Sequence, residues 1–397
     1  MSGRRYALVA GGGTAGHLQP ALAIAEALVR RGHPRESIEF VGSARGQDGA
    51  TLDGRGYPVT LLPGRGIARS LRPRVVVRNL GALVGLAAAM VRAVGIVHDR
   101  RPAVVVAVGG YASIPAGVAA VVLGVPLVLV NVDAVPGAAN RLLGRFARAA
   151  AVGWEGTPLP RAVVTGTPVR PEIAAVVRDA PHRRSARREL GLPPDRTTVA
   201  AFGGSLGARK VNQAVTDLCA RWKDREELTI LHIVGRRDWD PGMATTPGEP
   251  PAPGLRVVRV AYEDRMALVY EAVDLVVCRA GAMTVAELAV AGVPSVLVPL
   301  PGAPGDHQTE NARMLERAGG GVILTDRACD VEGLSAVLGG LLADPARLET
   351  MGRSAASLGR SDAADAGAGV VEAHARRTGT HGDGVRPAQG GGGGRSG

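Results

Sequence analysis

The sequence predicts two doubly wound, Rossmann-like α/β domains that face a shared cleft, and three observations support this. The 397 residues are enough for two domains, each with its own core. Apolar residues make up 46% of the chain and aromatic residues only 3%, which favours buried parallel strands covered by Ala-rich helices. Two glycine-rich turns, GGGTAGH at 11–17 and GGSLGA at 203–208, each follow an apolar strand and open a helix. Such turns suit phosphate-bearing ligands, because glycine permits close approach and helix N-termini offer N–H groups.

The first half of the chain alternates strands and helices, as expected of a doubly wound parallel sheet. The helix that follows the first glycine turn is predicted at Pro20–Arg30. The predicted strands of this half are Tyr6–Ala10, Ser37–Val41, Val59–Leu62, Ala103–Val108, Pro126–Val130 and Ala149–Val152.

A charged, proline-flanked junction at 166–196 separates this half from the second, where the alternation restarts. We therefore predict an N-terminal domain at 1–168 and a C-terminal domain at 169–353. A last helical stretch at 346–375 would cross back, so that a helix around 354–376 completes the first domain. The tail at 377–397 is too rich in glycine to bury apolar surface and is expected to be disordered. The predicted strands of the second half are Thr198–Phe202, Leu228–Val234, Leu255–Val260, Leu275–Cys278, Ser295–Val298 and Gly321–Leu324.

The net charge of +11 argues for an anionic partner. Arginine is spread over the whole chain and few aromatic residues are available to stack on bases, so we expect no nucleic-acid binding. An anionic lipid surface suits the charge better. The cysteines Cys219, Cys278 and Cys329 share no metal-ligand spacing, and the chain has no export segment, which favours a reducing cytosol.

The longest apolar stretch, Leu80–Val91, is too short to span a bilayer. Arginines precede it at 72, 74 and 78, and Arg92 follows it. A basic-flanked apolar helix can lie in a membrane interface, and it can equally be an ordinary core helix. The sequence leaves both interpretations open for residues 71–94.

The first glycine turn also fits the dinucleotide pattern Gly11-x-Gly13-x-x-Gly16, with Glu39 at the end of the next strand. That pattern favours an NAD enzyme as a rival interpretation. The turn continues directly into His17, however, and the second half has a comparable turn of its own. Both features favour a two-domain enzyme that binds two phosphate-bearing substrates.

The segment 278–287 is the most specific part of the second half. It leaves a buried strand, turns through Gly281 and starts a helix whose Glu287 can accept both hydroxyls of a ribose, while the N–H groups of the turn face a diphosphate. The alternative for Glu287 is a helix-capping acid. Two further features follow other strands, where open α/β sheets bind ligands: the polar residues at 306–311 and the turn at Gly109–Gly110. The alternative for Gly109–Gly110 is a tight βα turn without a ligand.

Taken together, these segments resemble the MurG family of bacterial glycosyltransferases, over roughly residues 5–370. The family implies a GT-B fold and an inverting transfer of GlcNAc from UDP-GlcNAc to the undecaprenyl-linked muramyl-pentapeptide precursor of peptidoglycan. It also implies peripheral association with the cytoplasmic face of the plasma membrane. The segments that carry the resemblance are GGGTAGH (11–17), GGYASIPAG (109–117), AVPGAAN (134–140), TGTPVR (165–170), GGSLGAR (203–209), YEDRM (262–266), CRAGAMTVAEL (278–288) and DHQTENA (306–312).

The resemblance implies roles for individual residues on both sides of the cleft. On the acceptor side, Thr14, Ala15 and Gly16 would line the cleft, and the acceptor diphosphate would lie near Gly13–Gly16 and Gly109–Gly110. On the donor side, the diphosphate would be bound by Arg170 and Ser205 and by a turn formed by Met283, Thr284 and Val285. The backbone around Tyr262 and Glu263 would bind uracil. Glu287 would hold the ribose, and Gln308 would contact the GlcNAc hydroxyls.

Two departures from the family pattern stand out. Residues 130–133 read Val-Asn-Val-Asp where the family has His-Glu-x-Asn, so Asp133 replaces an Asn that contacts the donor sugar. A carboxylate cannot donate the amide hydrogen bond and adds negative charge near a diphosphate. Ala15 replaces a glycine of the first turn. These changes favour a paralogue: a second MurG, or one with another donor sugar or acceptor.

For the mechanism we expect direct displacement at the anomeric carbon, with His17 as the general base and Asp133 as the competing candidate. We find no Asp-x-Asp pair and no His/Cys cluster that would supply a metal, and we expect a metal-independent reaction without a cofactor. Two readings from other classes stay open: a catalytically silent protein that binds the lipid precursor as a scaffold, and a Rossmann dehydrogenase.

Overall fold

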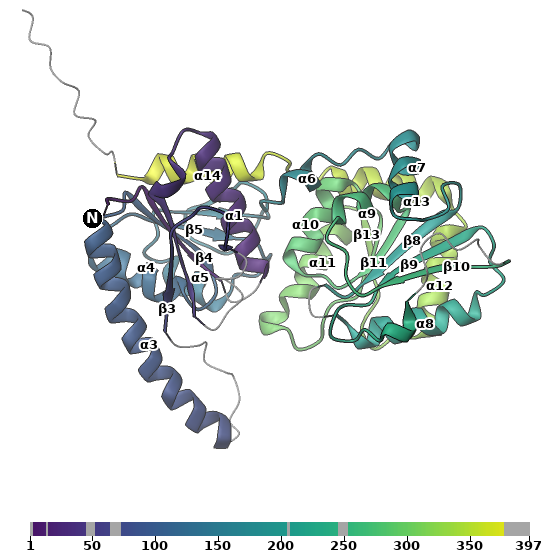
Figure 1. Cartoon of the computed structure of the whole chain (residues 1–397), viewed down its shortest axis with the longest axis horizontal. Coiled ribbons are helices and arrows are strands. Elements are labelled where there is room, and N and C mark those ends of the chain that lie inside the picture. Colours follow the sequence, from purple (N-terminus) through teal and green to yellow (C-terminus); the bar gives the residue numbers. More distant parts are fainter. Residues whose placement is uncertain are drawn as a thin grey trace, which may run out of the picture.

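The structure is a computed structural model of the whole chain, and it describes residues 3–12, 15–44, 52–63, 73–204, 207–244 and 253–376. For Ala15 and residues 73–84 only the backbone is described. The chain forms two α/β domains that lie side by side, each built on a parallel sheet (Figure 1). The fold predicted from the sequence is therefore confirmed. The tail at 377–397 lies outside the described residues.

The first sheet has the strand order β3-β2-β1-β4-β5-β6-β7, and every pairing is parallel. The predicted strands are present with ends shifted by at most two residues, but β7 was not predicted. It is a three-residue edge strand whose side chains are all exposed, so it lacks the burial pattern that marks a strand in sequence. The strands are β1 (Ala7–Gly11), β2 (Ile38–Ser43), β3 (Val59–Leu62), β4 (Val104–Gly109), β5 (Leu127–Asn131), β6 (Ala149–Val152) and β7 (Ala162–Val164).

The α-helices of this domain follow β1, β3, β4 and β5 along the chain. Helix α1 (Ala15–Arg30) begins five residues before the predicted Pro20, because the glycine turn runs directly into it. The others are η1 (Arg35–Ser37), α3 (Pro73–Arg100), α4 (Ser113–Val122) and α5 (Ala138–Leu143). Within the described residues, no helix combines the length and hydropathy needed to cross a bilayer.

The second sheet has the order β10-β9-β8-β11-β12-β13 and is also parallel. Its strands are β8 (Thr197–Phe202), β9 (Leu228–Ile233), β10 (Arg256–Val260), β11 (Leu275–Cys278), β12 (Ser295–Leu297) and β13 (Gly321–Ile323). Its helices are α6 (Pro171–Ala174), α7 (Ala180–Glu189), α8 (Arg209–Arg221), η2 (Pro241–Met243), α9 (Met266–Ala272), α10 (Ala282–Ala291), η3 (Pro304–Asp306), α11 (His307–Arg317), α12 (Val331–Leu342) and α13 (Pro345–Ala356).

The last helical stretch, predicted as one unit at 346–375, is two helices. After α13 the chain turns at 357–362, and α14 (Ala363–His374) packs against α1 of the first domain (Figure 1). Gly367 permits this close approach, since a Cβ there would lie 2.3 Å from Cδ1 of Ile24. Ion pairs from Arg31 and His33 to Glu372 fix the end of α14. The domain boundary at 168/169 itself stays a prediction.

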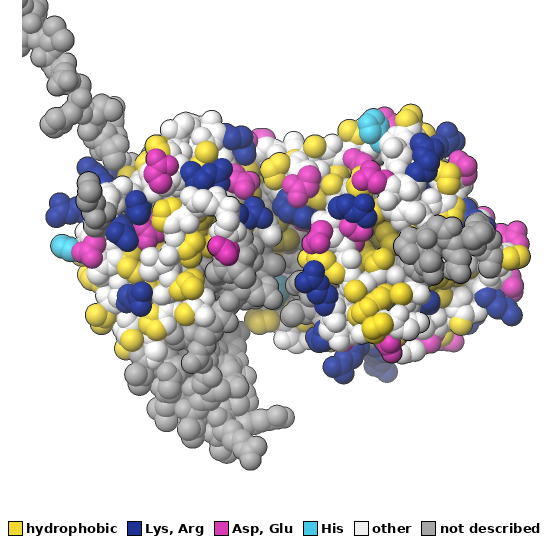
Figure 2. Space-filling model, viewed as in Figure 1, with side chains coloured by type: hydrophobic (Ala, Val, Ile, Leu, Met, Phe, Trp, Pro, Cys, Tyr) yellow, Lys and Arg dark blue, Asp and Glu magenta, His cyan; other side chains and the backbone are white. Residues whose placement is uncertain are grey.

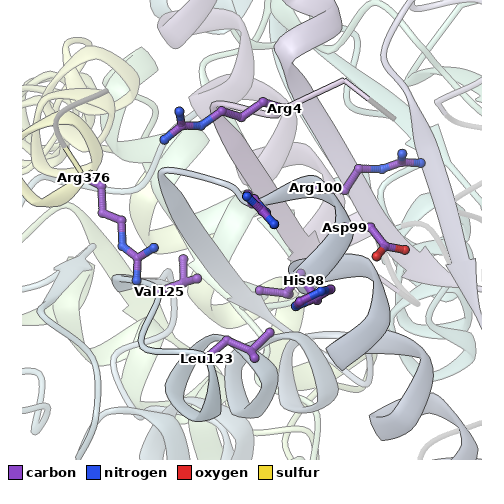
Figure 3. A pocket seen from close by; sticks show the side chains of 9 residues that line it. Arg4, His98, Asp99, Arg100, Leu123, Val125 and Arg376 are labelled. Atoms are coloured by element: carbon purple, nitrogen blue, oxygen red, sulfur yellow. The ribbon is translucent and has the colours of Figure 1, made fainter. Parts of the chain in front are cut away.

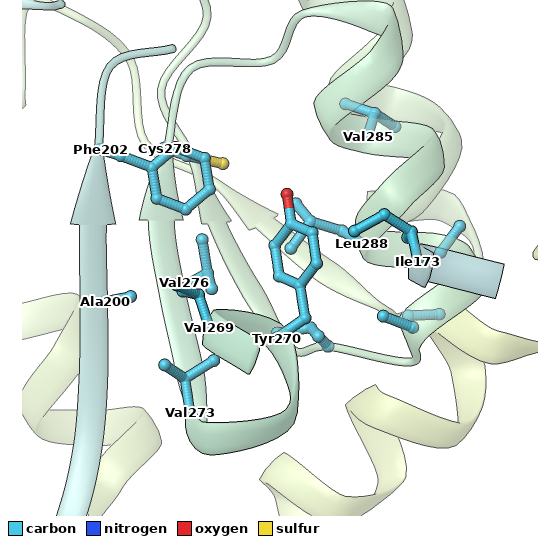
Figure 4. Packing of buried hydrophobic residues seen from close by; sticks show 14 of the residues in the cluster. Ile173, Ala200, Phe202, Val269, Tyr270, Val273, Val276, Cys278, Val285 and Leu288 are labelled. Carbon is cyan, nitrogen blue, oxygen red and sulfur yellow. The ribbon is translucent and has the colours of Figure 1, made fainter. Parts of the chain in front are cut away.

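Apolar side chains fill both faces of each sheet. In the second domain, Figure 4 shows Tyr270 and Phe202 packed between β8, β11 and the helices beside them. The three cysteines are buried and unbonded to each other. Burial raises the pKa of the Cys219 and Cys329 thiols to about 11, so these thiols stay protonated at neutral pH.

Candidate functional site

The two glycine turns of the first domain meet at the carboxyl ends of β1 and β4. Gly110 has a φ of +79°, and a Cβ on it would lie 2.3 Å from the carbonyl oxygen of Gly12. The buried Ser113 hydroxyl donates to the carbonyl oxygen of Ala10 at 2.8 Å and accepts the N–H of Gly109 at 2.9 Å. The turn at Gly109–Gly110 thus packs directly against the first glycine turn. An isolated βα turn would not need that contact.

His17 lies against these two packed glycine turns. A Cβ on Gly109 would lie 2.8 Å from Cδ2 and 3.0 Å from Nε2 of His17, and Gly109 has a φ of +112°. The imidazole is half-buried, at the first turns of α1. The fold therefore brings the predicted base to both glycine turns. Gly16 lies in the first turn of α1, Ala15 is described by its backbone alone, and Thr14 lies outside the described residues.

Glu39 does not serve as the ribose acceptor of a dinucleotide site. It is 1% exposed, and its Oε2 lies 2.9 Å from Nε of Arg5 and 3.0 Å from Nε of Arg100. Its other oxygen accepts the Thr60 hydroxyl at 2.7 Å. Because the carboxylate is surrounded by protein donors, the dinucleotide interpretation loses the residue on which it depends.

In the second domain, Glu287 and Arg170 lie close together, although 117 positions separate them in the numbering. Oε1 of Glu287 lies 3.7 Å from Nη2 of Arg170, and Oε2 accepts the Tyr270 hydroxyl at 2.9 Å. Figure 4 shows Tyr270 in its core position with the hydroxyl toward α10. Glu287 therefore makes tertiary contacts and does not cap its helix. Tyr270 was missed because nothing in the sequence links it to Glu287.

Burial raises the pKa of Glu287 against the opposing effects of Arg170 and the Tyr270 hydrogen bond. A raised pKa means that ionised Glu287 disfavours folding: its stabilising contribution is complete below the ordinary carboxyl pKa and is lost as pH rises through the raised value.

Glu287→Gln should therefore raise the free energy of unfolding at about pH 8, with the gain vanishing toward about pH 4, where the acid is already neutral. If Glu287 holds the donor ribose, as the sequence resemblance implies, the same variant should bind UDP-GlcNAc about tenfold more weakly, since hydrogen bonds to a charged acceptor are the stronger ones. Denaturant titrations at both pH values and calorimetry of donor binding measure the two effects. Lower stability of the variant at pH 8 would show that the pairing with Arg170 outweighs the cost of burial.

The N-terminus of α10 offers its first N–H groups, at Ala282, Met283 and Thr284, because the cap residue Gly281 supplies no side-chain acceptor. The resemblance also implies that Val285 serves the diphosphate turn, but in the structure Val285 is engaged elsewhere. Its N–H donates to the carbonyl oxygen of Gly281 at 3.0 Å, and its side chain is 0% exposed in the core. Any diphosphate at this turn would be served by the three residues before it.

The other predicted donor residues lie on loops of the second domain. Tyr262 is 42% exposed, with the Arg236 guanidinium 4.3 Å from its ring centre. Glu263 accepts the backbone N–H and the Nε of Arg265 at 2.9 and 3.0 Å, which fixes the loop. The side-chain oxygen of Gln308 accepts the Leu300 N–H at 3.0 Å, which leaves its amide NH2 to donate. Ser205 lies outside the described residues.

The expectation that the sequence holds no paired metal ligands overlooked Asp238 and Asp240, which form an Asp-x-Asp pair. Both carboxylates have protein partners: Asp238 pairs with Arg237 at 3.1 Å, and Asp240 accepts the Gly242 N–H at 2.9 Å. Among the described residues, no three His, Cys, Asp or Glu side chains are grouped as metal ligands. Metal independence stays a prediction.

Asp133 joins the two domains. Its Oδ1 accepts the side-chain amide of Asn311 at 3.0 Å, and Oδ1 of Asn311 accepts the N–H of Ala134 at 2.8 Å. The same amide lies 3.3 Å from the carbonyl oxygen of Ala280, which precedes α10. Asn311 is fully buried. The sequence pattern placed Asn311 in the segment DHQTENA (306–312) but gave it no role. In the structure, Asn311 links the loop after β5 to the second domain.

Two parallel α/β domains, two packed glycine turns beside a histidine, and a partly buried Glu287–Arg170 pair with the buried Tyr270 are the features of a two-domain glycosyltransferase of the GT-B type. The N-terminal domain model of glycosyltransferase family 28 matches residues 7–152, and the C-terminal domain model matches residues 198–366. The chain belongs to the MurG family within this group.

The relatives that place it there cover nearly the whole chain. The UDP-N-acetylglucosamine--N-acetylmuramyl-(pentapeptide) pyrophosphoryl-undecaprenol N-acetylglucosamine transferases of Streptomyces coelicolor and of a Nocardioides species are 40% and 42% identical, over 92% of this chain and 97% and 96% of theirs. The crystal structure of Acinetobacter baumannii MurG is 27% identical, with a TM-score of 0.74 over 93% of this chain and 99% of that one. Membership in this family replaces the dehydrogenase interpretation.

Proposed function

We propose that this chain transfers N-acetylglucosamine from UDP-GlcNAc to the 4-hydroxyl of the muramyl sugar in MurNAc-(pentapeptide)-pyrophosphoryl-undecaprenol. The observation that carries the proposal is the near-complete match to relatives whose names state this transfer. The geometry supports it, because the Glu287–Arg170–Tyr270 group suits a ribose and a diphosphate.

In the proposed mechanism, neutral His17 takes the proton of the acceptor hydroxyl as its oxygen attacks the anomeric carbon. The bond from that carbon to the diphosphate oxygen breaks with inversion, and UDP leaves with the electron pair. Arg170 and the N–H groups at the start of α10 stabilise the charge that develops on the leaving group. Protonated His17 then releases its proton to solvent, which restores the base.

Asp133 has a positioning role in this proposal, because one of its oxygens is already held by Asn311 across the domain junction. Asp133→Asn should lower the KM for UDP-GlcNAc by about three- to tenfold, since the amide removes a negative charge near the diphosphate and adds a donor. It should leave kcat within about threefold, because no proton is transferred to this residue. Steady-state kinetics on the parent and the variant give both values.

The same variant separates the two candidate bases. If Asp133 accepts the proton, kcat should fall by about 10²-fold or more, because an amide cannot act as a base. Asn311→Asp is the matched variant on the other domain: it places two carboxylates together, so it should weaken the interdomain contact without touching the acceptor hydroxyl.

The direct test of the function is transfer of radiolabelled GlcNAc to a short-chain lipid-linked muramyl-pentapeptide, with and without a chelator. Equal transfer in both would support a metal-independent enzyme that needs no cofactor. Transfer that the chelator inhibits would instead favour a metal requirement, with Asp238 and Asp240 as candidate ligands. A sample that binds UDP but transfers nothing would favour another donor or acceptor. A sample that does not bind UDP would favour the scaffold alternative.

We also propose that the chain works at the cytoplasmic face of the plasma membrane, with residues 71–94 toward an anionic lipid surface and no nucleic-acid partner. The described part of α3 supports a mixed role: Ala89 and Ala93 are buried against the core, whereas Val91 is 75% exposed beside the exposed Arg92. The helix is therefore partly a core helix. Its exposed apolar and basic side chains suit the interface of an anionic membrane.

A further inference from the structure

A basic cavity lies in the first domain, away from the glycine turns. Its volume is about 850 Å3. It forms where α3 ends, where α4 connects to β5, and where the chain enters β1 and leaves α14. Figure 3 shows Arg4 and Arg376 reaching its region from different segments, with Val125 and Leu123 beside them. The lining residues are Arg4, Val97, His98, Asp99, Arg100, Arg101, Leu123, Val125 and Arg376.

The charge of the lining is unbalanced: it holds four arginines and a histidine but a single carboxylate, Asp99, while Arg100 is also paired with Glu39 outside the lining. Figure 2 shows Lys and Arg side chains and a histidine gathered at this edge of the molecule. A concave surface lined by one sign of charge concentrates counter-ions of the other sign. The cavity is therefore suited to an anion.

The four arginines divide into two that are fixed and two that are available. Arg376 donates to the carbonyl oxygen of Gly124 at 2.6 Å, and Nε of Arg100 lies 3.0 Å from the buried Glu39 carboxylate. Arg4 and Arg101 are exposed and form no ion pair with any residue that the structure describes. The fixed pair shapes the wall, and the available pair can close on a ligand.

We propose that this cavity binds a phosphate group carried by a small molecule or a lipid headgroup. Guanidinium groups match phosphate oxygens in pairs, and several arginines suit the charge of a phosphate better than that of a single carboxylate. The volume is that of a small-molecule site, and the lining has no Phe, Tyr or Trp on which a nucleic-acid base could stack.

The cavity is distinct from the glycosyl-transfer site because the two lie at opposite ends of β4. Arg100 and Arg101 precede this strand, whereas Gly109 and Gly110 end it. Six residues of strand span about 20 Å, so a ligand in the cavity cannot contact the glycine turns at the same time. The proposal therefore does not depend on the function proposed above.

The test is a calorimetric titration of inorganic pyrophosphate into the full chain saturated with UDP, which fills the donor site. The charge-removing variant Arg4→Gln/Arg101→Gln should lower the pyrophosphate affinity by at least about tenfold, because each arginine contributes charged hydrogen bonds. Arg4→Lys/Arg101→Lys should restore only part of it, because an ammonium group keeps the charge but cannot form the paired hydrogen bonds of a guanidinium. The matched control Arg188→Gln/Arg327→Gln, on exposed arginines of the second domain, should change it by less than about twofold.

Co-sedimentation with phosphatidylglycerol and phosphatidylcholine vesicles then distinguishes the sources. Loss of both pyrophosphate and phosphatidylglycerol binding in the Arg4/Arg101 variant supports a lipid headgroup, and loss of pyrophosphate binding alone supports a soluble phosphate compound. Melting temperatures of the Gln and Lys variants equal to that of the parent show that folding is intact. If UDP-saturated protein binds no pyrophosphate, or if the Gln variant binds it like the control, the proposal is overturned.

Discussion

Replacing His17 with alanine is expected to lower kcat for GlcNAc transfer by about 10²- to 10⁴-fold, the range for loss of a general base. The reason is positional as well as chemical. The imidazole packs against Gly109, in the turn beside which the acceptor diphosphate is expected. UDP binding should stay within about twofold, because the residues proposed to bind UDP lie in the second domain.

The measurement is a single-turnover transfer assay with UDP affinity determined in parallel. His182→Ala is the matched control, since this exposed histidine lies in the second domain, where its Nδ1 is 2.7 Å from Oδ1 of Asp179. Turnover of His17→Ala at the parent rate would remove this residue from the chemistry and leave Asp133 as the candidate. A loss of UDP affinity equal to the loss of rate would show a folding defect.

The second large effect is expected at Gly110. An alanine there places its Cβ about 2.3 Å from the carbonyl oxygen of Gly12, a contact that backbone atoms can relieve only by moving. The residue also has a φ of +79°, where an L side chain is strained. Gly110→Ala should separate the two glycine turns, abolish acceptor use, and lower the unfolding free energy by about 2–4 kcal/mol.

Gly156→Ala is the matched control, because Gly156 has a similar φ of +73° but nothing within 4 Å of the added Cβ. It carries the backbone strain without the collision and should cost only about 1 kcal/mol. Denaturant unfolding and a titration with the lipid-linked acceptor measure the difference. Equal losses in the two variants would mean that backbone strain alone matters and that the contact between the turns does not.

The sequence by itself determined the fold and the local elements that carry the candidate donor residues. Patterns a few residues long specify strands such as Leu275–Cys278, the two glycine turns and the helix start at 281–287. Glycine, capping and apolar periodicity act through the local backbone, so their consequences can be predicted without knowing the rest of the chain.

Only the tertiary structure decided which of these residues meet. Asp133 and Asn311 are 178 positions apart, and their hydrogen bond depends on how two domains pack. The contact of Gly110 with Gly12, the salt bridges that occupy Glu39, and the return of α14 onto α1 are likewise long-range. A local pattern specifies where a strand or turn lies, but a partner distant in sequence is set by the packing of whole elements. That is the reason the roles of Asp133 and Glu39 emerged only from the fold.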